Sequence, residues 1–249
     1  MSDKYPSLSS YVYCADNPVI LVDQDGEDIV YMGEGGTEVK RIKDDKINKT
    51  YVTDINADRI QMTNLNGCGG MGWIEAPMPN LIEKETDSKY QKYDYLIAAE
   101  VSYFNQYKNK GETPKYTNGQ SIDNSRTIPN LDPTLVKAII MKETVMGTAP
   151  SRGLNDASSD IMQANVWYSK KSNDWNKSKE QFGLQRKGGA TPYQSIHAGI
   201  GILYQKGLRT LRNSTTFMGW SIATDRYNGN GVKNYGECVR NMVKNSISY

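Results

Sequence analysis

The sequence predicts an α+β protein in which a small β-rich region precedes a mostly helical region. Three observations predict this fold class. Short apolar runs separated by glycine- and aspartate-rich turns occupy residues 11–80, which is typical of strands. Apolar residues recur at helical spacing in residues 83–107 and 131–144. The charge also changes sign along the chain, from 12 Lys+Arg against 19 Asp+Glu in residues 1–114 to 18 against 9 in residues 115–249, which supports a boundary between the two regions.

The β-rich region is expected to contain several short strands. Apolar runs at 18–22 and 29–32 flank the turn sequence Asp-Gln-Asp-Gly, and further strands are expected at 49–55 and 59–65. A glycine-rich turn then leads into a closing Met-Gly-Trp-Ile at 71–74. This succession resembles the small bacterial Src-homology-type barrels found beside wall-degrading domains. The resemblance implies a β-barrel-like module that binds the wall, docks a partner or covers one end of the next domain; a different small β module is the alternative.

A helix is expected next, at residues 83–107, followed by a polar loop at 111–129. We interpret the helix as packing against the region that follows it, because it carries an apolar stripe formed by Tyr93, Leu96, Ile97, Val101 and Phe104. The chain is therefore predicted to divide into a β module at 1–80, a connecting helix and loop at 81–124 and a helical domain at 125–249.

The helix expected at 131–144 carries a single acid, Glu143, near its end. Asp132 followed by Pro133 is typical of an N-cap with proline at the first helical position, and Gly147 lies where a helix should stop. One face should be buried, since apolar or small side chains occur at Leu135, Val136, Ala138, Ile139 and Ile140. Glu143 then lies at the edge of an apolar core, where desolvation raises a carboxyl pKa and favours proton donation. A structural or solvated carboxylate is the alternative.

Three later segments accompany this helix in a recognisable order. They are Asp-Ile-Met-Gln at 160–163, an apolar helical segment at 195–203 and Arg-Tyr-Asn-Gly-Asn-Gly at 226–231. Together with the helix ending at Glu143, they resemble in order and approximate spacing the motifs of the lytic transglycosylases and goose-type lysozymes, over roughly residues 125–245. The resemblance implies a lysozyme-like helical domain that cleaves the β-1,4 bond between N-acetylmuramic acid and N-acetylglucosamine in peptidoglycan.

The resemblance also implies a mechanism. Glu143, at the position of the family's catalytic glutamate, protonates the glycosidic oxygen and then, as a carboxylate, takes a proton from the C6 hydroxyl of the same sugar. That hydroxyl attacks C1 and leaves a 1,6-anhydro product, and no second carboxylate is required because the nucleophile is tethered. Thr144 replaces the serine that usually follows the glutamate and preserves a hydroxyl.

Four further residues match motif positions of the family. Met162 and Gln163 match the residues that shape the cleft floor and contact sugar, although methionine is also a common filler of hydrophobic cores. Tyr227 matches the tyrosine whose hydroxyl orients the catalytic carboxylate; one more aromatic among 17 tyrosines is the alternative. Asn228 is expected to hold the following turn or to support the sugar.

Goose-type lysozymes reach a hydrolytic outcome with aspartates on the loop between the first two motifs. Asp156 and Asp160 are the acids of that loop here, and Asn165 stands where the goose-type pattern has an aspartate. Asp160 also replaces the motif's glycine, and is expected either to cap the next helix or to activate water. The loss at Asn165 favours a lytic transglycosylase. A goose-type lysozyme and a non-catalytic glycan-binding component of a secretion or phage-tail assembly are the alternatives.

No cofactor or metal is expected. The chain has a single histidine, His197, and three cysteines, at 14, 68 and 238, without metal-ligand spacing. A disulfide between the first two cysteines and three free thiols are both open. No nucleic-acid motif occurs, so the basic C-terminal half fits an anionic polymer such as peptidoglycan, or is a solvated face.

The N-terminus lacks a basic region followed by an uninterrupted apolar stretch, and no apolar run is long enough to cross a bilayer. We therefore expect either that a signal has been removed or that delivery to the cell wall or periplasm follows a route without a signal peptide. A secretion-system effector or a phage-tail-type wall-opening enzyme fits that route, with an immunity or secretion-apparatus protein as partner.

Overall fold

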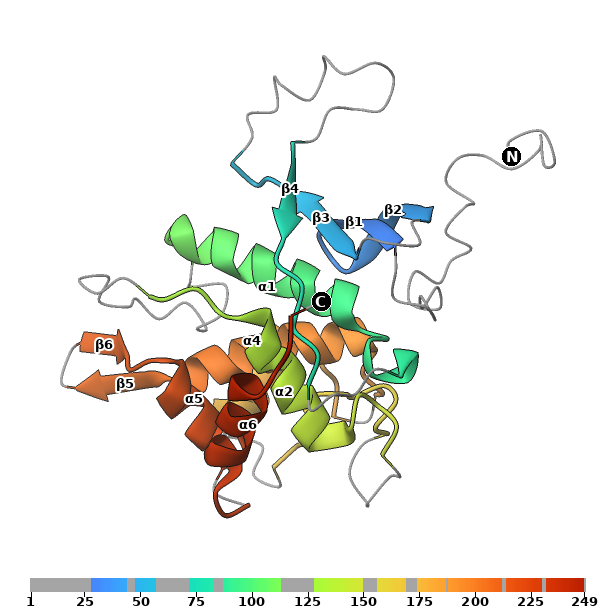
Figure 1. Ribbon diagram of the computed structural model, residues 1–249. Helices are drawn as coiled ribbons and strands as arrows, with labels where there is room; N and C mark the ends of the chain where they lie inside the picture. The colour runs from blue at the N-terminus through green and yellow to red at the C-terminus, as the bar shows by residue number, and fades with distance from the viewer. Residues whose placement is uncertain are drawn as a thin grey trace.

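The computed structural model describes residues 28–43, 48–56, 72–82, 87–112, 128–149, 156–168, 174–186, 188–211, 214–229 and 232–248. Within them, an N-terminal β-sheet is followed by a group of helices, which confirms the α+β class (Figure 1). The strands expected at 18–22 and 59–65 lie outside the described residues, as do Cys14 and Cys68.

The N-terminal sheet contains four strands in the order β2-β1-β3-β4, where β1 is Asp28–Gly33, β2 is Thr37–Lys43, β3 is Lys49–Thr53 and β4 is Trp73–Ala76. Neighbours β1 and β3 are parallel, and the other two pairs are antiparallel. In the described part of the chain the sheet is open, with β2 and β4 at its edges, so the expected barrel closure is not found.

Strand β2 is absent from the sequence prediction, whereas β1, β3 and β4 match expected strands within a few residues. β2 carries charges on both faces and is half exposed along its length, which an edge strand tolerates because one side has no neighbour. The two successive glycines in the turn before β2 are the sequence signal for this hairpin. Gly35 and Gly36 have φ values of 87° and 72°, a backbone region that glycine favours in tight hairpins.

Helix α1 (Asp94–Asn109) joins the sheet to the other helices (Figure 1). The hydroxyl of Tyr103 donates to the carbonyl of Met32 at 2.9 Å and lies 2.6 Å from the hydroxyl of Thr53. The backbone N–H of Asp28 donates to the hydroxyl of Tyr95 at 2.7 Å. α1 begins later than expected, after the short 3-10 helix Ser88–Tyr90, and its predicted stripe is buried except for the partly exposed Leu96.

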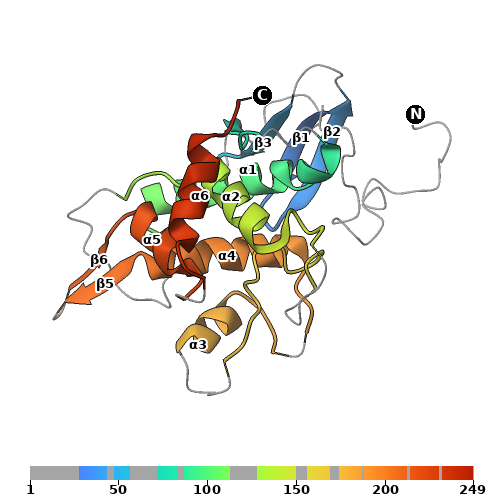
Figure 2. The ribbon, with the colours of Figure 1, turned by 60° about the horizontal axis from the view of Figure 1, so that its bottom comes forward.

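The helical region is arranged around α2 (Pro133–Thr144), which contacts α1 and α6 (Figure 2). Its predicted N-cap is confirmed, since the carboxylate of Asp132 accepts the N–H of Thr134 at 2.8 Å with Pro133 in the first turn. The remaining elements are α3 (Asp174–Gln181), α4 (Pro192–Lys206), the hairpin β5 (Leu208–Leu211) and β6 (Ser214–Phe217), α5 (Trp220–Tyr227) and α6 (Tyr235–Lys244).

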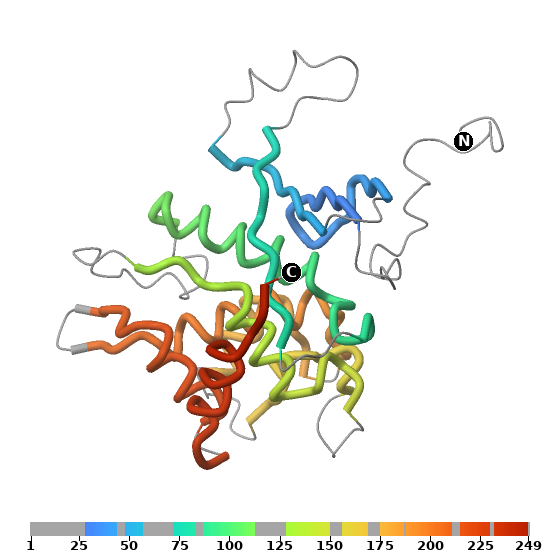
Figure 3. The backbone as a smooth tube through the Cα atoms, in the orientation of Figure 1, coloured from blue at the N-terminus to red at the C-terminus, as the bar shows by residue number. Residues whose placement is uncertain are grey.

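A single hydrophobic cluster extends through the sheet and the helices. It includes Val30 and Val52 from the sheet and the whole predicted face of α2. The segment after β4 also pairs with the C-terminal segment, where Leu81 and Ile247 exchange backbone hydrogen bonds of 2.8 and 3.0 Å (Figure 3). The division expected at residue 80 therefore does not separate two hydrophobic cores.

Two glycines in α4 allow side chains from neighbouring segments to approach the helix closely. A Cβ atom added at Gly199 would lie 2.4 Å from the sulfur of Met162, and one at Gly201 would lie 2.1 Å from the ring of Phe182. Real Cβ atoms do not approach so closely, so a side chain at either position would force its neighbour to move. This packing holds the segments around residues 162 and 182 against α4.

Gly201→Ala is expected to destabilise the protein by about 1–3 kcal/mol, because the rigid ring of Phe182 has to move away from the new methyl group. A chemical denaturation midpoint measures the effect. Gly189→Ala is the control, since nothing lies within 4 Å of a Cβ atom there and its φ is not in the left-handed region. Equal midpoints for the two variants would contradict this packing argument.

Candidate active site

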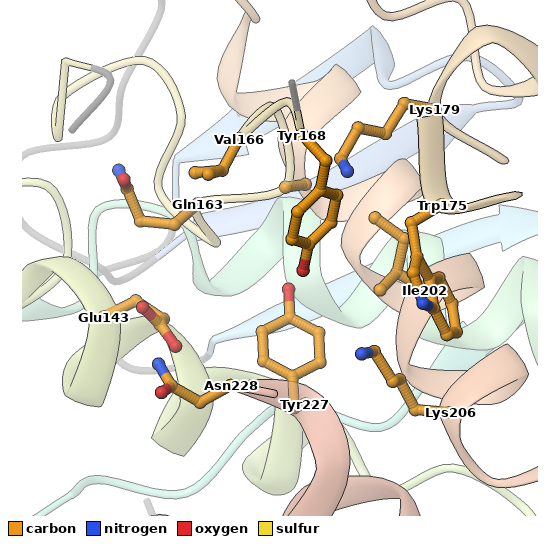
Figure 4. Close-up of a pocket in the computed structure, with 11 residues that line it drawn as sticks. Glu143, Gln163, Val166, Tyr168, Trp175, Lys179, Ile202, Lys206, Tyr227 and Asn228 are labelled. Carbon is orange, nitrogen blue, oxygen red and sulfur yellow. The ribbon is translucent and has the colours of Figure 1, made fainter. Parts of the chain in front are cut away.

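A cavity of about 180 Å³ lies at the C-terminal end of α2 (Figure 4). Its walls come from α2, α3, α4, the end of α5 and the segment 163–168. The lining residues are Glu143, Gln163, Ala164, Val166, Tyr168, Trp175, Lys179, Ile202, Lys206, Tyr227 and Asn228. Glu143, Gln163, Tyr227 and Asn228, four residues singled out in the sequence, are thus brought together around one space.

Glu143 is the one acid among the described residues that line this cavity. Burial raises the pKa of its carboxyl group, while hydrogen bonds with Tyr235 and Asn228 act in the opposite direction. The predicted position at the edge of the core, and the predicted direction of the pKa shift, are both confirmed. The carboxyl group is therefore held in a defined orientation and made easier to protonate than a solvated one.

The tyrosine that contacts this carboxylate is Tyr235, in the first turn of α6. Its hydroxyl donates to Oε1 of Glu143 at 2.7 Å. Tyr227 was expected to orient this carboxylate, but its hydroxyl donates to the backbone carbonyl of Met162 at 3.0 Å, and its ring stacks on Tyr235 with centroids 6.5 Å apart. The contact expected of Tyr227 is therefore made by a neighbour. Tyr235 begins an amphipathic pattern with Val239 that indicates burial, and this was the available signal.

Asp160 stabilises a turn rather than lining the cavity. It is fully buried, and its two carboxylate oxygens accept the backbone N–H groups of Ala164 and Asn165, each at 2.9 Å. The hydroxyl of Ser195, in α4, also donates to it at 2.7 Å. Of the two roles expected for Asp160, the structure supports capping, although the capped element is a turn, and its burial argues against water activation.

Met162 lies in the core beneath the cavity. Its side chain has no exposed surface and packs against Gly199, and its backbone N–H donates to the hydroxyl of Ser195 at 2.9 Å. The expected contact with sugar is therefore wrong, and the core-filling alternative is correct. Gln163, the next residue, does line the cavity and has a left-handed φ of 51°.

Two other predicted residues act outside the cavity. The hydroxyl of Thr144 donates to the carbonyl of Ile161 at 2.7 Å, which fixes the second motif against the end of α2. Asp156 is exposed and accepts hydrogen bonds from the backbone and hydroxyl of Ser158, which lower its pKa. Asp156 does not line the cavity, so the structure does not bring it together with Glu143 there.

The opposite wall of the cavity was missed by the sequence analysis. It consists of Tyr168, Trp175 and two lysines (Figure 4). The Nζ atom of Lys206 lies 4.0 Å from the ring centroid of Trp175, and that of Lys179 lies 4.9 Å from the centroid of Tyr168. Aromatic rings present flat apolar faces of the kind on which sugar rings pack, and the lysines add positive charge.

His197 and Cys238 do not line this cavity. His197 lies 3.0 Å from Glu100 and stacks on Tyr193. Cys238 is a free thiol. Within the described segments, no cluster of His, Cys, Asp or Glu has the composition of a metal site. None of the helices in the same segments has the length and hydropathy needed to cross a bilayer.

The arrangement thus combines one oriented carboxyl group of raised pKa with a cavity that has an aromatic, positively charged far wall. Such a carboxyl group can donate a proton to a bound substrate and receive one afterwards.

Comparisons of this chain with protein-family models, with curated proteins and with solved structures found no match.

Proposed function

We propose that the protein cleaves peptidoglycan glycan strands as a lytic transglycosylase, with Glu143 acting first as an acid and then as a base. The observation that carries this proposal is the state of Glu143: it is partly buried, it is held by Tyr235 and Asn228, and it faces a cavity with aromatic walls. The motif resemblance identifies this residue as the family's acid and supports a lysozyme-like domain around it.

In the first step, protonated Glu143 donates to the oxygen of the β-1,4 bond between N-acetylmuramic acid and N-acetylglucosamine. Tyr235 donates its hydroxyl hydrogen to Oε1, so Oε2 carries the acidic proton. The glycosidic C1–O bond breaks as that oxygen receives the proton. Positive charge then develops at C1 of the muramic sugar, opposite the newly formed carboxylate.

In the second step the Glu143 carboxylate accepts the proton of the C6 hydroxyl while the hydroxyl oxygen bonds to C1. The hydrogen bonds from Tyr235 and Asn228 stabilise the carboxylate between the two steps. The products are a 1,6-anhydro muramic terminus and a free 4-hydroxyl group, and Glu143 is again protonated. Water is not consumed, because the nucleophile belongs to the substrate.

The positions of the loop acids favour this route over hydrolysis. A second carboxylate that activates water needs access to the cavity. Asp160 has both oxygens occupied within the fold, and Asp156 lies outside the lining. Asn165, which stands where goose-type lysozymes have an aspartate, donates its amide to the carbonyl of Gly188 at 2.8 Å.

Digestion of purified, insoluble peptidoglycan tests the proposal. The expected result is release of soluble muropeptides by the wild-type protein. Binding to the insoluble material without release would contradict it and would place the protein among glycan-binding components of a secretion or phage-tail assembly.

A further inference from the structure

Lys179 is a buried lysine at the wall of the cavity that Glu143 also lines. Only 4% of its surface is exposed, and none of the ion pairs formed by the described residues includes it. Its Nζ atom lies instead near aromatic rings, 4.9 Å from the centroid of Tyr168 and 5.8 Å from that of Trp167. Burial of a cation that forms no ion pair is unfavourable for folding, which points to a role for Lys179 beyond stability.

A second lysine, Lys206, approaches the same space from the end of α4. Its Nζ atom lies 4.0 Å from the centroid of Trp175, which also lines the cavity. The two cations repel each other, and this repulsion is the second cause, after burial, of the lowered pKa of Lys179. The fold therefore holds two positive charges close together at one end of the cavity.

One buried acid, Asp160, partly offsets the charge of Lys179 from within the fold. Asp160 raises the pKa of Lys179, but both of its oxygens accept hydrogen bonds from backbone N–H groups. Figure 4 shows Glu143 with Asn228 on the other side of the cavity, separated from the lysines by the rings of Tyr227 and Tyr168. The described walls thus place an acid at one end and two cations at the other.

We infer that Lys179 and Lys206 form a subsite for a carboxylate carried by the glycan strand bound at Glu143. This inference rests on the proposed function. Two sources on peptidoglycan share the required chemistry: the lactyl carboxylate of an unsubstituted muramic sugar, and a carboxylate of a stem peptide. Trp175 and Tyr168 supply flat faces for the sugar beside that carboxylate. A neutral strand such as chitin has neither carboxylate, so the subsite selects for muramic strands.

The charge state of Lys179 agrees with this assignment. Its pKa is lowered to about 8, so at neutral pH the lysine is mostly protonated and can donate hydrogen bonds to a bound carboxylate. A bound carboxylate favours the charged form and raises this pKa again. The groups that face Lys179 are Lys206 from α4, Asp160 from the segment 156–168 and the rings of Trp167 and Tyr168.

Binding of small probes to the Glu143→Gln variant tests the subsite without cleavage. The three probes, titrated by NMR, are the disaccharide of N-acetylglucosamine and N-acetylmuramic acid, muramyl dipeptide and neutral chitobiose. At least one acidic probe is expected to bind about tenfold or more tightly than chitobiose, since hydrogen bonds between charged groups are strong. The first carries the lactyl carboxylate and the second a peptide carboxylate, so the tighter one identifies the source.

When Lys179→Gln or Lys206→Gln is combined with Glu143→Gln, the preference for the acidic probe is expected to disappear. Lys177 is exposed and lies on the same helix as Lys179, so Lys177→Gln is the control and should keep the preference. Lys206 is less buried than Lys179, so its variant is informative even if Lys179→Gln does not fold. In the Glu143→Gln protein, the pKa of Lys179 should also rise on binding of the acidic probe. Equal binding of all probes, or an equal loss in Lys177→Gln, would overturn the inference.

Failure of the subsite and failure of the proposed activity give different results. Lysine-dependent binding of an acidic probe by a protein that releases nothing from peptidoglycan would retain the subsite and reject the enzyme. Release of muropeptides by a protein with no preference among the probes would retain the enzyme and reject the subsite.

Discussion

Glu143→Gln is expected to abolish the release of muropeptides while the protein remains folded. The amide cannot donate an acidic proton or act as a base, and general acid–base catalysis contributes about 10²- to 10⁴-fold. The amide oxygen can still accept the hydrogen bond of Tyr235, so the cavity should keep its shape. Release of soluble fragments from peptidoglycan measures the effect.

The direction in which Glu143→Gln changes the stability of the protein can also be predicted. Burial places the folded-state pKa of Glu143 above its unfolded-state pKa. Ionisation of this group therefore destabilises the folded state as pH rises through the unfolded-state pKa, and the penalty is complete above the folded-state pKa. Glutamine removes this penalty, and the melting temperature at neutral pH should equal or exceed that of the wild type. Glu237→Gln, at an exposed acid of α6, is the matched control and should retain activity. Retained activity in Glu143→Gln would exclude Glu143 as the acid.

Tyr235→Phe is expected to move the pH dependence of cleavage. The acid form of Glu143 is the active form for the first step, so kcat/KM should fall as pH rises through the pKa of Glu143. The hydrogen bond from Tyr235 lowers that pKa. Its loss should therefore shift the alkaline limb to higher pH. The value of kcat/KM at the optimum should fall about 10- to 100-fold, since hydrogen bonds to charged groups contribute about 1.5–3 kcal/mol.

Tyr227→Phe is the matched control for this shift. It removes the same atom from a neighbouring ring, but the hydroxyl of Tyr227 is bonded to the backbone of Met162 rather than to Glu143. Its alkaline limb should remain at the wild-type position. If Tyr227→Phe shifted the alkaline limb of the pH profile and Tyr235→Phe did not, Tyr227 rather than Tyr235 would be the tyrosine that orients Glu143, as the motif implied.

Local signals in the sequence were sufficient for the helix that carries Glu143. Asp132 and Pro133 define where α2 begins, and the spacing of its apolar residues determines which face is buried. These properties depend on neighbours within a few positions, so a single sequence reveals them. The position of Glu143 in the last turn, at the edge of the core, follows from the same pattern.

The partners of Glu143 required the tertiary structure. Tyr235 lies 92 positions from Glu143 in the chain, and only the packing of α6 on α2 brings them together. The burial of Lys179 could not be predicted from the sequence either, because helix α3 is short and polar and has no apolar stripe. Asp160 and Met162 were singled out as motif positions, but whether their side chains face the cavity or the core depends on the turn at 160–165 and on Ser195.

Mass spectrometry of the muropeptides released from purified peptidoglycan tests the central claim most directly. The account predicts strands that end in 1,6-anhydro-N-acetylmuramic acid, lighter by one water molecule than the hydrolytic products. The same digestion with Glu143→Gln should yield neither form. Reducing ends in the wild-type digest would contradict the account, because they show that water rather than the C6 hydroxyl of the substrate attacks C1.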